Sequence, residues 1–338
     1  MSAEASVWNG PDGGSAAGVE AILAASDPVV RERLADVERR LVEVAAQGAG
    51  PLAEHAQATV AAGGKRLRPL LVLVVGGDSA PAESAGRAAL AVELIHSATL
   101  VHDDILDAAS LRRGRPTVVA AAGRAVATAT GDLLFACAFS ELARNGRPEE
   151  VQALSDASAA LAHGELLQRE DAWCDDVSVE RYLERCELKT ATLFDAACHL
   201  GGLEAGSPPE TLAGLRKFGR GVGLAFQLLD DVLDVAGPPE RTGKARGTDL
   251  LDGTVTLPLI LGRRRDPELA RLALREVDGL AAAEEVCDRI VASGALHEVR
   301  ERALQLAHDA QAAIPSDLPA GKRQALELVA RGVVERHS

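Results

Sequence analysis

The stretch LVHDDILD, residues 100–107, places three aspartates at the end of an otherwise apolar run, and QLLDDVLD, residues 227–234, repeats the arrangement. Asp103 and Asp107 are four residues apart, so on a helix their side chains share one face. Like charges at that spacing destabilise a helix by roughly a few tenths of a kcal/mol unless something neutralises them. The repeated motif therefore predicts bound cations.

The rest of the sequence predicts an all-α fold, because apolar residues recur at helical spacing and strand alternation is absent. Breakers such as Gly63-Gly64 and Gly201–Pro209 divide the pattern into about ten to thirteen helices. The segments 85–101 and 215–235 are apolar on nearly all sides, which is typical of central, buried helices. We expect one all-α domain over 18–338, after a disordered tail at residues 1–17.

Charge and composition exclude several classes of protein. The net charge is −14 and basic residues cluster only locally, so a nucleic acid is not an expected partner. The longest purely apolar run, 69–77, is too short to span a bilayer, and we expect no transmembrane segment. The N-terminus has no basic-then-apolar signal, and the five cysteines show no C-x-x-C spacing. These features predict a cytoplasmic protein with reduced thiols.

The segment GGKRLRP, residues 63–69, collects cations where a helix is expected to begin, near Arg68. Lys65, Arg66 and Arg68 oppose the helix dipole at that end. A bound anion would reconcile them, because cations and backbone N–H groups would then point at one phosphate. A solvated cluster of charges is the alternative.

The segment LRRGRPT, residues 111–117, follows the first acidic motif and brings Arg112 and Arg113 within reach of a metal-bound phosphate. Arginines are favoured at a helix C-terminus in any case, so a purely structural role stays open. Lys189-Thr190 and Lys244 read, in isolation, as ordinary surface positions.

The acidic motifs suit magnesium, which prefers oxygen ligands and usually retains waters and substrate phosphates. Two facing carboxylate clusters would hold several Mg²⁺ ions around a diphosphate. Calcium is less favoured, because the spacing is not that of an EF-hand loop. Glu93 and His96 form E-x-x-H, a di-iron pattern, but that site needs a second copy. On a helical wheel His96 instead lies on the stripe of Asp103 and Asp107.

With these residues assembled, the chain resembles the trans-isoprenyl diphosphate synthases, or polyprenyl synthetases. The resemblance runs from about residue 60 to 262 through ordered motifs: GGKRLRP, ELIHSATLVHDDILD, LRRGRPT, TGDLLFA, GELLQ, KTATLF, FQLLDDVLD, GKARGTDL and TLPL. It implies the isoprenoid synthase fold, with mostly antiparallel helices around a central substrate cavity. It also implies condensation of isopentenyl diphosphate with an allylic diphosphate.

The resemblance also implies a role for each matching residue. Three Mg²⁺ ions would be held by Asp103, Asp107 and Asp230, supported by Asp104, Asp231 and Asp234. Isopentenyl diphosphate would be held by Lys65, Arg68, His96 and Arg113, and the allylic diphosphate by Arg112, Lys189 and Lys244. Oxygen dipoles near the reacting carbon would come from Thr190 and Gln227. One departure is Thr254, which stands where many relatives carry a second lysine on the allylic side.

Two other functions compete with this interpretation. A class I terpene cyclase would also carry D-D-x-x-D. Cyclases usually line the cavity with aromatic residues, however, and this chain has only eight aromatic residues in total, which disfavours a cyclase. A non-catalytic subunit of a heteromeric synthase would be expected to lose metal ligands, and both motifs are intact. The resemblance further suggests a homodimer.

Product length depends on the side chains one helical turn before Asp103. Thr99 and Ala98 are small here, and the resemblance implies that bulky aromatics at these places stop growth early. Deeper obstruction could come from Ile95, or from Phe135 and Phe139, which could equally be core residues. We expect products of thirty or more carbons, with the twenty-carbon geranylgeranyl diphosphate as the alternative.

Overall fold

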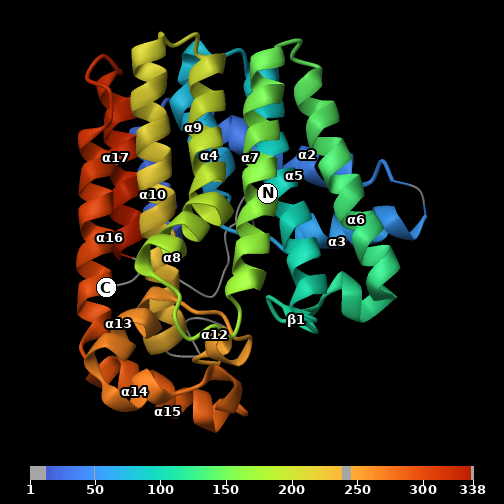
Figure 1. The fold of residues 1–338 in the computed structure, drawn as a ribbon. Helices are drawn as coiled ribbons and strands as arrows, with labels where there is room; N and C mark the ends of the chain where they lie inside the picture. The colour runs from blue at the N-terminus through green and yellow to red at the C-terminus, as the bar shows by residue number, and fades with distance from the viewer. Residues whose placement is uncertain (1–12, 49, 238–244, 336–338) are drawn as a thin grey trace. The chain divides into compact units, whose positions relative to one another are not determined.

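The computed structural model describes residues 13–48, 50–237 and 245–335 (Figure 1). Its elements are α1 (Gly13–Ala25), α2 (Val29–Ala45), α3 (Pro51–Ala61), α4 (Leu67–Gly76), η1 (Gly77–Ser79), α5 (Ala82–Leu106), β1 (Leu111–Arg112), β2 (Arg115–Pro116), α6 (Val118–Ala143), α7 (Pro148–Asp171), α8 (Val179–Cys186), η2 (Glu187–Ala191), α9 (Thr192–Glu204), α10 (Pro209–Ala236), α12 (Thr248–Leu251), α13 (Leu257–Arg265), α14 (Pro267–Arg271), η3 (Leu274–Glu276), α15 (Leu280–Ala292), α16 (Ala295–Ala312) and α17 (Ala320–Glu335). Within these ranges the only strands are the two-residue pair β1 and β2. The all-α prediction is confirmed.

The chain divides into two compact units. Unit 1 comprises Met1–Ser158, Leu193–Arg216 and Ile314–Val329, and unit 2 comprises Ala159–Thr192, Lys217–Ala313 and Ala330–Ser338. Four of the five boundaries fall inside helices, in α7, α9, α10 and α17, and the fifth, at Ala313–Ile314, falls in the connection between α16 and α17. A single domain remains a prediction. Of the predicted tail, residues 1–12 lie outside the described part, and α1 begins at Gly13.

Helix α5 is the buried centre of unit 1, as its sequence predicts. It contacts α2, α3, α4 and α6, and Leu90, Leu94 and Ile95 are fully buried. A helix that is apolar on all sides needs neighbours on all sides, which explains this central place. The acidic motif at its C-terminal end is therefore carried on a helix that is packed on several sides.

The predicted break at Gly201–Pro209 is present, because α9 ends at Glu204 and α10 begins at Pro209, but Gly201 and Gly202 themselves lie inside α9. A Cβ on Gly201 would lie 2.5 Å from the carbonyl oxygen of Val72 on α4, and a Cβ on Gly202 would lie 2.6 Å from Leu212. The two glycines therefore allow neighbouring helices to approach α9 closely. That requirement outweighs their low helix propensity.

Helix α4 is fixed at both ends. It begins at Leu67 after Arg66, within one residue of the predicted start. At its other end the ammonium of Lys322 donates to the carbonyl oxygens of Val75, at 3.1 Å, and Gly76, at 2.9 Å. A cation at a helix C-terminus stabilises the helix by satisfying these carbonyls and its dipole. The N-terminal turn that carries Arg68 is thus held by the whole helix.

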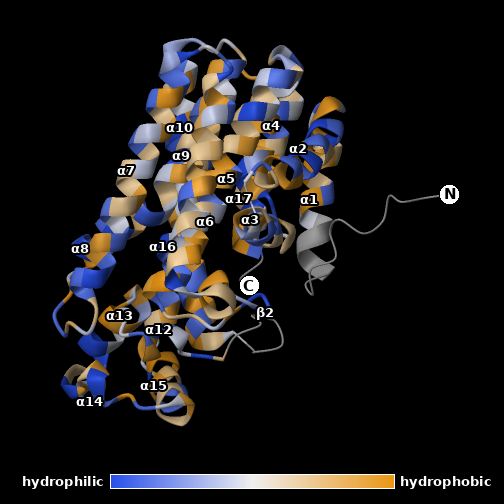
Figure 2. Ribbon diagram, turned by 90° about the vertical axis from the view of Figure 1, so that its right-hand side faces the viewer, coloured by the Kyte–Doolittle hydropathy of each residue, from blue (hydrophilic) through white to orange (hydrophobic). Residues whose placement is uncertain are grey.

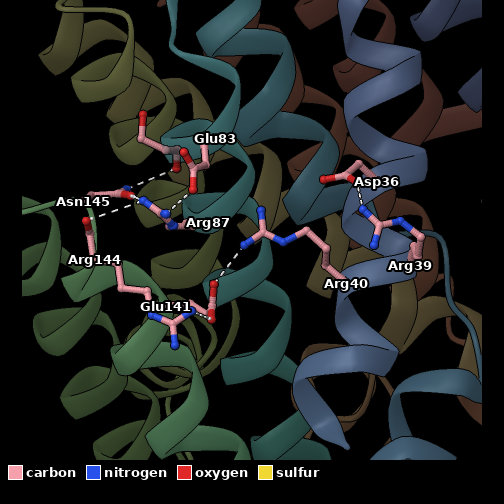
Figure 3. Close-up of polar contacts among 9 residues, drawn as sticks. Asp36, Arg39, Arg40, Glu83, Arg87, Glu141, Arg144 and Asn145 are labelled. Atoms are coloured by element: carbon pink, nitrogen blue, oxygen red, sulfur yellow. Dashed lines mark hydrogen bonds and ion pairs between the residues drawn. The ribbon is translucent and has the colours of Figure 1, made fainter. Parts of the chain in front are cut away.

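Ion pairs join α2 and α6 across unit 1 (Figure 3). Arg40 of α2 donates to Glu141 of α6 at 2.9 Å, and Arg144 donates to the same carboxylate at 2.6 Å. The Glu141 side chain is only 2% exposed, and the two guanidinium groups neutralise it. A buried charge needs such partners.

A second buried carboxyl group, Glu150 at the start of α7, lies close to Glu204 of α9 and is paired only loosely with a cation, since the Nε of Arg147 is 3.8 Å away. The side-chain amide of Asn145 donates to Glu150 at 2.9 Å and to Glu204 at 3.0 Å. Burial is the main cause that raises the pKa of Glu150, and its hydrogen bond to Glu204 adds to the effect. The two carboxyl groups are therefore best satisfied when they share a proton.

In unit 2, α10 packs against α16, and α8 is an amphipathic helix. A Cβ on Gly221 would lie 2.9 Å from Ala310, so that glycine permits the α10–α16 contact. Helix α8 carries both hydrophobic and hydrophilic residues (Figure 2), and its Tyr182 is fully buried. Arg185, also buried, donates to the carbonyl oxygen of Val255 at 2.6 Å and thereby ties α8 to the chain before α13.

Among the described helices, α6 alone is long and apolar enough to cross a bilayer, judged by length and composition. Only 28% of its most apolar window is buried. The helix contains Gly123, with φ of 82°, and charged residues at Arg124, Asp132 and Glu141. Core helices of soluble bundles pass the same test, so length and composition alone do not identify α6 as a membrane span.

Candidate functional site

The first acidic motif lies at the C-terminal end of α5. The helix ends at Leu106, Asp107 is its C-cap, and the N–H of Asp107 donates to the carbonyl oxygen of Asp103 at 2.8 Å. Asp104 is 5% exposed and accepts a hydrogen bond from Nε of Arg112 at 2.7 Å. Asp103 and Asp107 are partly exposed, so this motif presents two carboxylates and buries the third against an arginine.

The segment LRRGRPT forms a tight hairpin, which the helical interpretation missed. Arg112 pairs with Arg115 across β1 and β2. Between them Arg113 has φ of 52° and Gly114 has φ of 73°, the positive values that a type I′ turn requires. The hairpin directs Arg112 back to Asp104 and sends Arg113 to the loop before α4.

That loop, GGKRLRP, is built on positive φ angles at Gly63 (75°), Gly64 (153°) and Arg66 (46°). Glycine adopts these angles without strain, whereas an arginine does so at some expense. The ammonium nitrogen of Lys65 is buried in this loop. The backbone therefore turns sharply before Leu67 and presents its cations together.

A cluster of cations surrounds His96 in unit 1. Burial lowers the pKa of His96 well below 6.5, and the nearby guanidinium groups of Arg68 and Arg113 lower it further. Arg68 stacks 4.5 Å over the ring of Phe194, and its Nε is buried without a hydrogen-bond partner among the described residues. A Cβ on Gly64 would lie 3.1 Å from Arg113. The structure thus brings Arg68, His96 and Arg113 together around an uncharged imidazole.

Arg66 lies close enough to lower the pKa of His96, but its guanidinium is bound within the protein, and its expected contact with an anion stays a prediction. It is 5% exposed and donates to Glu38 at 2.6 Å, to Glu93 at 2.5 Å and to the carbonyl oxygen of Val60 at 2.6 Å. These carboxylates offset the unfavourable interaction of the Arg66 charge with the dipole of α4. Glu93 is thereby occupied, which removes the di-iron alternative based on Glu93 and His96.

The second acidic motif, on α10 in unit 2, is held by a chain of directed hydrogen bonds. Tyr182 donates to one oxygen of Asp231 at 2.5 Å, and the amide nitrogen of Gln227 donates to the other at 2.8 Å. The amide oxygen of Gln227 accepts from the hydroxyl of Thr190 at 2.7 Å. Because each donor has a fixed acceptor, the Thr190 oxygen keeps its lone pairs for another partner.

The three aspartates of this motif differ in exposure. Asp231 is 3% exposed, and burial, with Asp249 and Asp230 nearby, raises its pKa above the ordinary range. Asp230 is exposed, and Asp234 accepts from the backbone N–H of Asp249 at 3.3 Å. As in the first motif, the middle aspartate is buried and the outer two are accessible.

The expected allylic cations are placed only in part. Lys189 lies in η2, a π-helical turn, and its ammonium forms an ion pair with Glu165 of α7. Lys244 lies outside the described residues. Thr254, in place of the usual lysine, donates its backbone N–H to the carbonyl oxygen of Asp249 at 2.8 Å.

The residues expected to control product length line up along α5 and α6. Ala98 and Ile95 are fully buried, and Thr99 is partly exposed with its hydroxyl donated to the carbonyl oxygen of His96 at 2.8 Å. On α6, Phe135 and Phe139 are partly exposed, and Phe135 stacks on His102 with ring centroids 5.7 Å apart. Their role in chain length remains a prediction.

Sequence reasoning missed two polar residues of unit 2, Tyr182 and Glu165. Tyr182 is the chain's single tyrosine and lies seven residues before Lys189, a spacing that puts both on one helical face. Glu165 belongs to the GELLQ motif, to whose residues the resemblance assigned no role. Helical register relative to Lys189 did not identify the partner of Tyr182, because Asp231 is 49 residues away, and Glu165 lies on a different helix.

The donor atoms of both motifs fit magnesium. They are carboxylate oxygens, the ligands that Mg²⁺ prefers, and magnesium usually takes one or two protein carboxylates and completes its octahedron with water and phosphate. In the part of the chain that the structure describes, no group of three or more His, Cys, Asp or Glu could by itself hold a metal ion. Open, phosphate-completed coordination therefore suits these residues better than a closed protein cage.

Known proteins resemble this chain along most of its length. The family model Polyprenyl synthetase matches residues 50–292. Octaprenyl diphosphate synthase of Escherichia coli is 36% identical over 283 residues, 82% of this chain and 87% of that protein. Heptaprenyl diphosphate synthase component 2 of Geobacillus stearothermophilus is 43% identical over 228 residues, 67% of this chain and 71% of that protein.

A solved structure agrees over nearly the whole chain. The crystal structure of a polyprenyl synthase from Caulobacter crescentus, complexed with calcium and isoprenyl diphosphate, has a TM-score of 0.86 and 34% identity. The match covers 95% of this chain and 98% of the Caulobacter crescentus chain.

Proposed function

The chain belongs to the polyprenyl synthetase family and is a prenyltransferase, and from this premise we propose that it condenses isopentenyl diphosphate head to tail with an allylic diphosphate in a Mg²⁺-dependent reaction. Its relatives include octaprenyl and heptaprenyl diphosphate synthases, which supports a product of medium to long chain.

The observation that carries this proposal is the uncharged His96 among guanidinium groups. An imidazole kept neutral by burial and by Arg68 and Arg113 can donate one hydrogen bond without being titrated near pH 7. The cations supply the charge that a diphosphate needs. We assign the diphosphate of isopentenyl diphosphate to Lys65, Arg68, His96 and Arg113.

The allylic diphosphate falls to Arg112, Lys189 and Lys244 in this proposal, with three Mg²⁺ ions held by Asp103, Asp107 and Asp230. Bound Mg²⁺ would neutralise the diphosphate and stabilise its departure. Asp104, Asp231 and Asp234 support the metal ligands, since two of them are buried and held by their own hydrogen-bond partners.

The chemistry asks the protein for orientation and charge and does not require a protein nucleophile. The allylic C–O bond breaks and its electron pair leaves with diphosphate. The double bond of isopentenyl diphosphate then forms the new C–C bond, and its C2 proton is lost to the departing diphosphate. The Thr190 hydroxyl, already donating to Gln227, turns its lone pairs outward and can stabilise the positive carbon. Fixed orientation of both substrates supplies up to ~7–11 kcal/mol.

Purified protein with Mg²⁺, labelled isopentenyl diphosphate and an allylic primer tests the activity. Elongated prenyl diphosphates support the proposal. Hydrocarbon products would indicate a cyclase. A lack of turnover until a second protein is added would indicate the subunit of a heteromeric synthase, an alternative that the name component 2 of one relative keeps relevant.

We propose products of thirty or more carbons, with geranylgeranyl diphosphate as the alternative. The residues before Asp103 are small, since Ala98 is a buried methyl group and Thr99 has turned its hydroxyl to the backbone. Ala98→Phe should shorten the products. Thr99→Tyr, at a partly exposed position, makes the same test if overpacking unfolds the first variant. Wild-type products that stop at fifteen carbons would contradict the proposal.

We also propose a homodimer. Only 28% of the most apolar window of α6 is fully buried in the single chain; on this helix Leu133 and Phe139 are partly exposed and Ala136 is exposed. Large uncovered apolar surfaces mark interaction sites. Sedimentation of the purified chain should give the dimer mass, and a monomer that is fully active would refute the proposal.

A further inference from the structure

An ion pair between α7 and the π-helical turn η2 has no role in the function proposed above. Glu165 contacts the ammonium of Lys189 and also accepts from Arg169, one helical turn away, at 2.8 Å. The side chains of Glu165 and Lys189 are 14% and 25% exposed, so the pair is mostly withdrawn from water.

The backbone holds this pair in place. A Cβ on Gly164 would lie 2.6 Å from the backbone nitrogen of Lys189 and 2.9 Å from its Cα, so only glycine allows α7 and η2 to touch here. A π-helical turn is rare and occurs mainly at functional sites. Because both backbones are fixed, Glu165 and Lys189 meet with less loss of side-chain freedom than two surface residues would.

We propose that Glu165 is a positioning residue that holds the ammonium of Lys189 and, by its negative charge, weakens the binding of diphosphate there. The inference rests on the proposed function, in which Lys189 binds the allylic diphosphate. An ammonium has three donors, so Lys189 can keep Glu165 while it binds a phosphate oxygen. The carboxylate then repels the diphosphate at close range and weakens its retention. Inorganic diphosphate leaves faster as a result.

Isothermal titration of inorganic diphosphate with Mg²⁺ into the full-length protein tests this. Glu165→Gln keeps the shape and an acceptor for Lys189 but removes the charge. It should tighten diphosphate binding by about three- to tenfold, the size expected for one partly buried charge. Inhibition by added diphosphate should strengthen in parallel, and KM for the allylic primer should fall together with kcat.

A double-mutant cycle and a matched control separate this from a general charge effect. In a Lys189→Ala background, Glu165→Gln should change binding by less than about twofold, because the coupled partner is gone. Glu187→Gln, on the same turn but paired with Arg220 at 3.2 Å, should leave binding unchanged. Unchanged or weaker binding in Glu165→Gln, or an equal gain in the Lys189→Ala background, overturns the inference. If Lys189→Ala itself alters neither diphosphate binding nor the allylic KM, the assignment of Lys189 in the proposed function falls as well.

Discussion

The two D-D-x-x-D motifs have nearly the same sequence, but the protein neutralises them differently. In the first, on α5, the buried Asp104 is bound by the guanidinium of Arg112. In the second, on α10, no arginine among the described residues binds the buried Asp231; Tyr182 and Gln227 donate neutral hydrogen bonds to it instead, and its pKa is raised by burial. One carboxylate is balanced by charge and the other by dipoles.

The difference teaches that a repeated motif specifies which oxygens are presented and leaves open what holds them. In both motifs the middle aspartate is buried and the outer two are accessible. A charge pair weakens with ionic strength, whereas a buried hydrogen bond between a hydroxyl and a carboxyl group does not. The two motifs should therefore respond differently to salt and to mutation.

The largest effect is expected where the two motifs are alike. Asp103→Ala and Asp230→Ala should each lower kcat by about three orders of magnitude or more, because each removes a proposed metal ligand. The fold should survive, since both residues are at least partly exposed. Steady-state kinetics and thermal melting check this, with the exposed Asp176→Ala as control. Near-normal turnover in either variant would end the functional equivalence of the motifs.

The next effect separates the cations that accompany the motifs. Lys65→Ala should raise KM for isopentenyl diphosphate by about ten- to a hundredfold and leave KM for the allylic primer nearly unchanged, since it removes a charge-assisted contact to one diphosphate. Lys189→Ala should show the opposite preference. Initial rates with each substrate varied in turn provide the measurement, and equal changes for both substrates would reject the division.

A smaller effect tests the two ways of neutralisation directly. Tyr182→Phe should lower the free energy of unfolding by about 2 kcal/mol, because Asp231 loses a buried donor. Arg112→Met should lower it by only about 1 kcal/mol, because that side chain is 31% exposed. Urea titrations at low and high salt distinguish them. The loss in Arg112→Met should shrink with added salt, and the same salt response in both variants would contradict the comparison.

The smallest effect concerns a third buried carboxyl group, Glu150, which accepts a hydrogen bond from Asn145, has only a long ion pair with Arg147 at 3.8 Å, and also faces Glu204. Its pKa is raised above 4.5 in the folded protein, so it contributes stability that is full below pH 4.5 and is lost as pH rises through the raised pKa. Glu150→Gln supplies a permanent donor toward Glu204 and should flatten this fall in melting temperature by a few degrees. The exposed neighbour Glu149→Gln serves as control, and parallel pH curves for Glu150→Gln and wild type would refute the shared proton.

Helical periodicity was enough to predict the all-α class, the buried centre of α5 and the start of α4 near Arg68. It failed where contacts between residues distant in the sequence determine the local structure. Gly201 stays helical because a carbonyl of α4 touches it, and Arg113-Gly114 form a hairpin turn because Asp104 and the loop before α4 bind its arginines. Tyr182 was missed because a single tyrosine in an amphipathic helix carries no motif. Such contacts are not local, so spacing alone could not reveal them.

The loop before α4 has an entropic consequence for binding. Gly63 and Gly64 give the unfolded chain unusual freedom here, and fixing each residue costs about 1–2 kcal/mol. In the folded protein the hydrogen bonds of Arg66 to the carboxylates of Glu38 and Glu93 and to the carbonyl oxygen of Val60 offset this entropic cost. For the proposed contacts of Lys65 and Arg68 with a diphosphate, the binding free energy is then not consumed in ordering this loop.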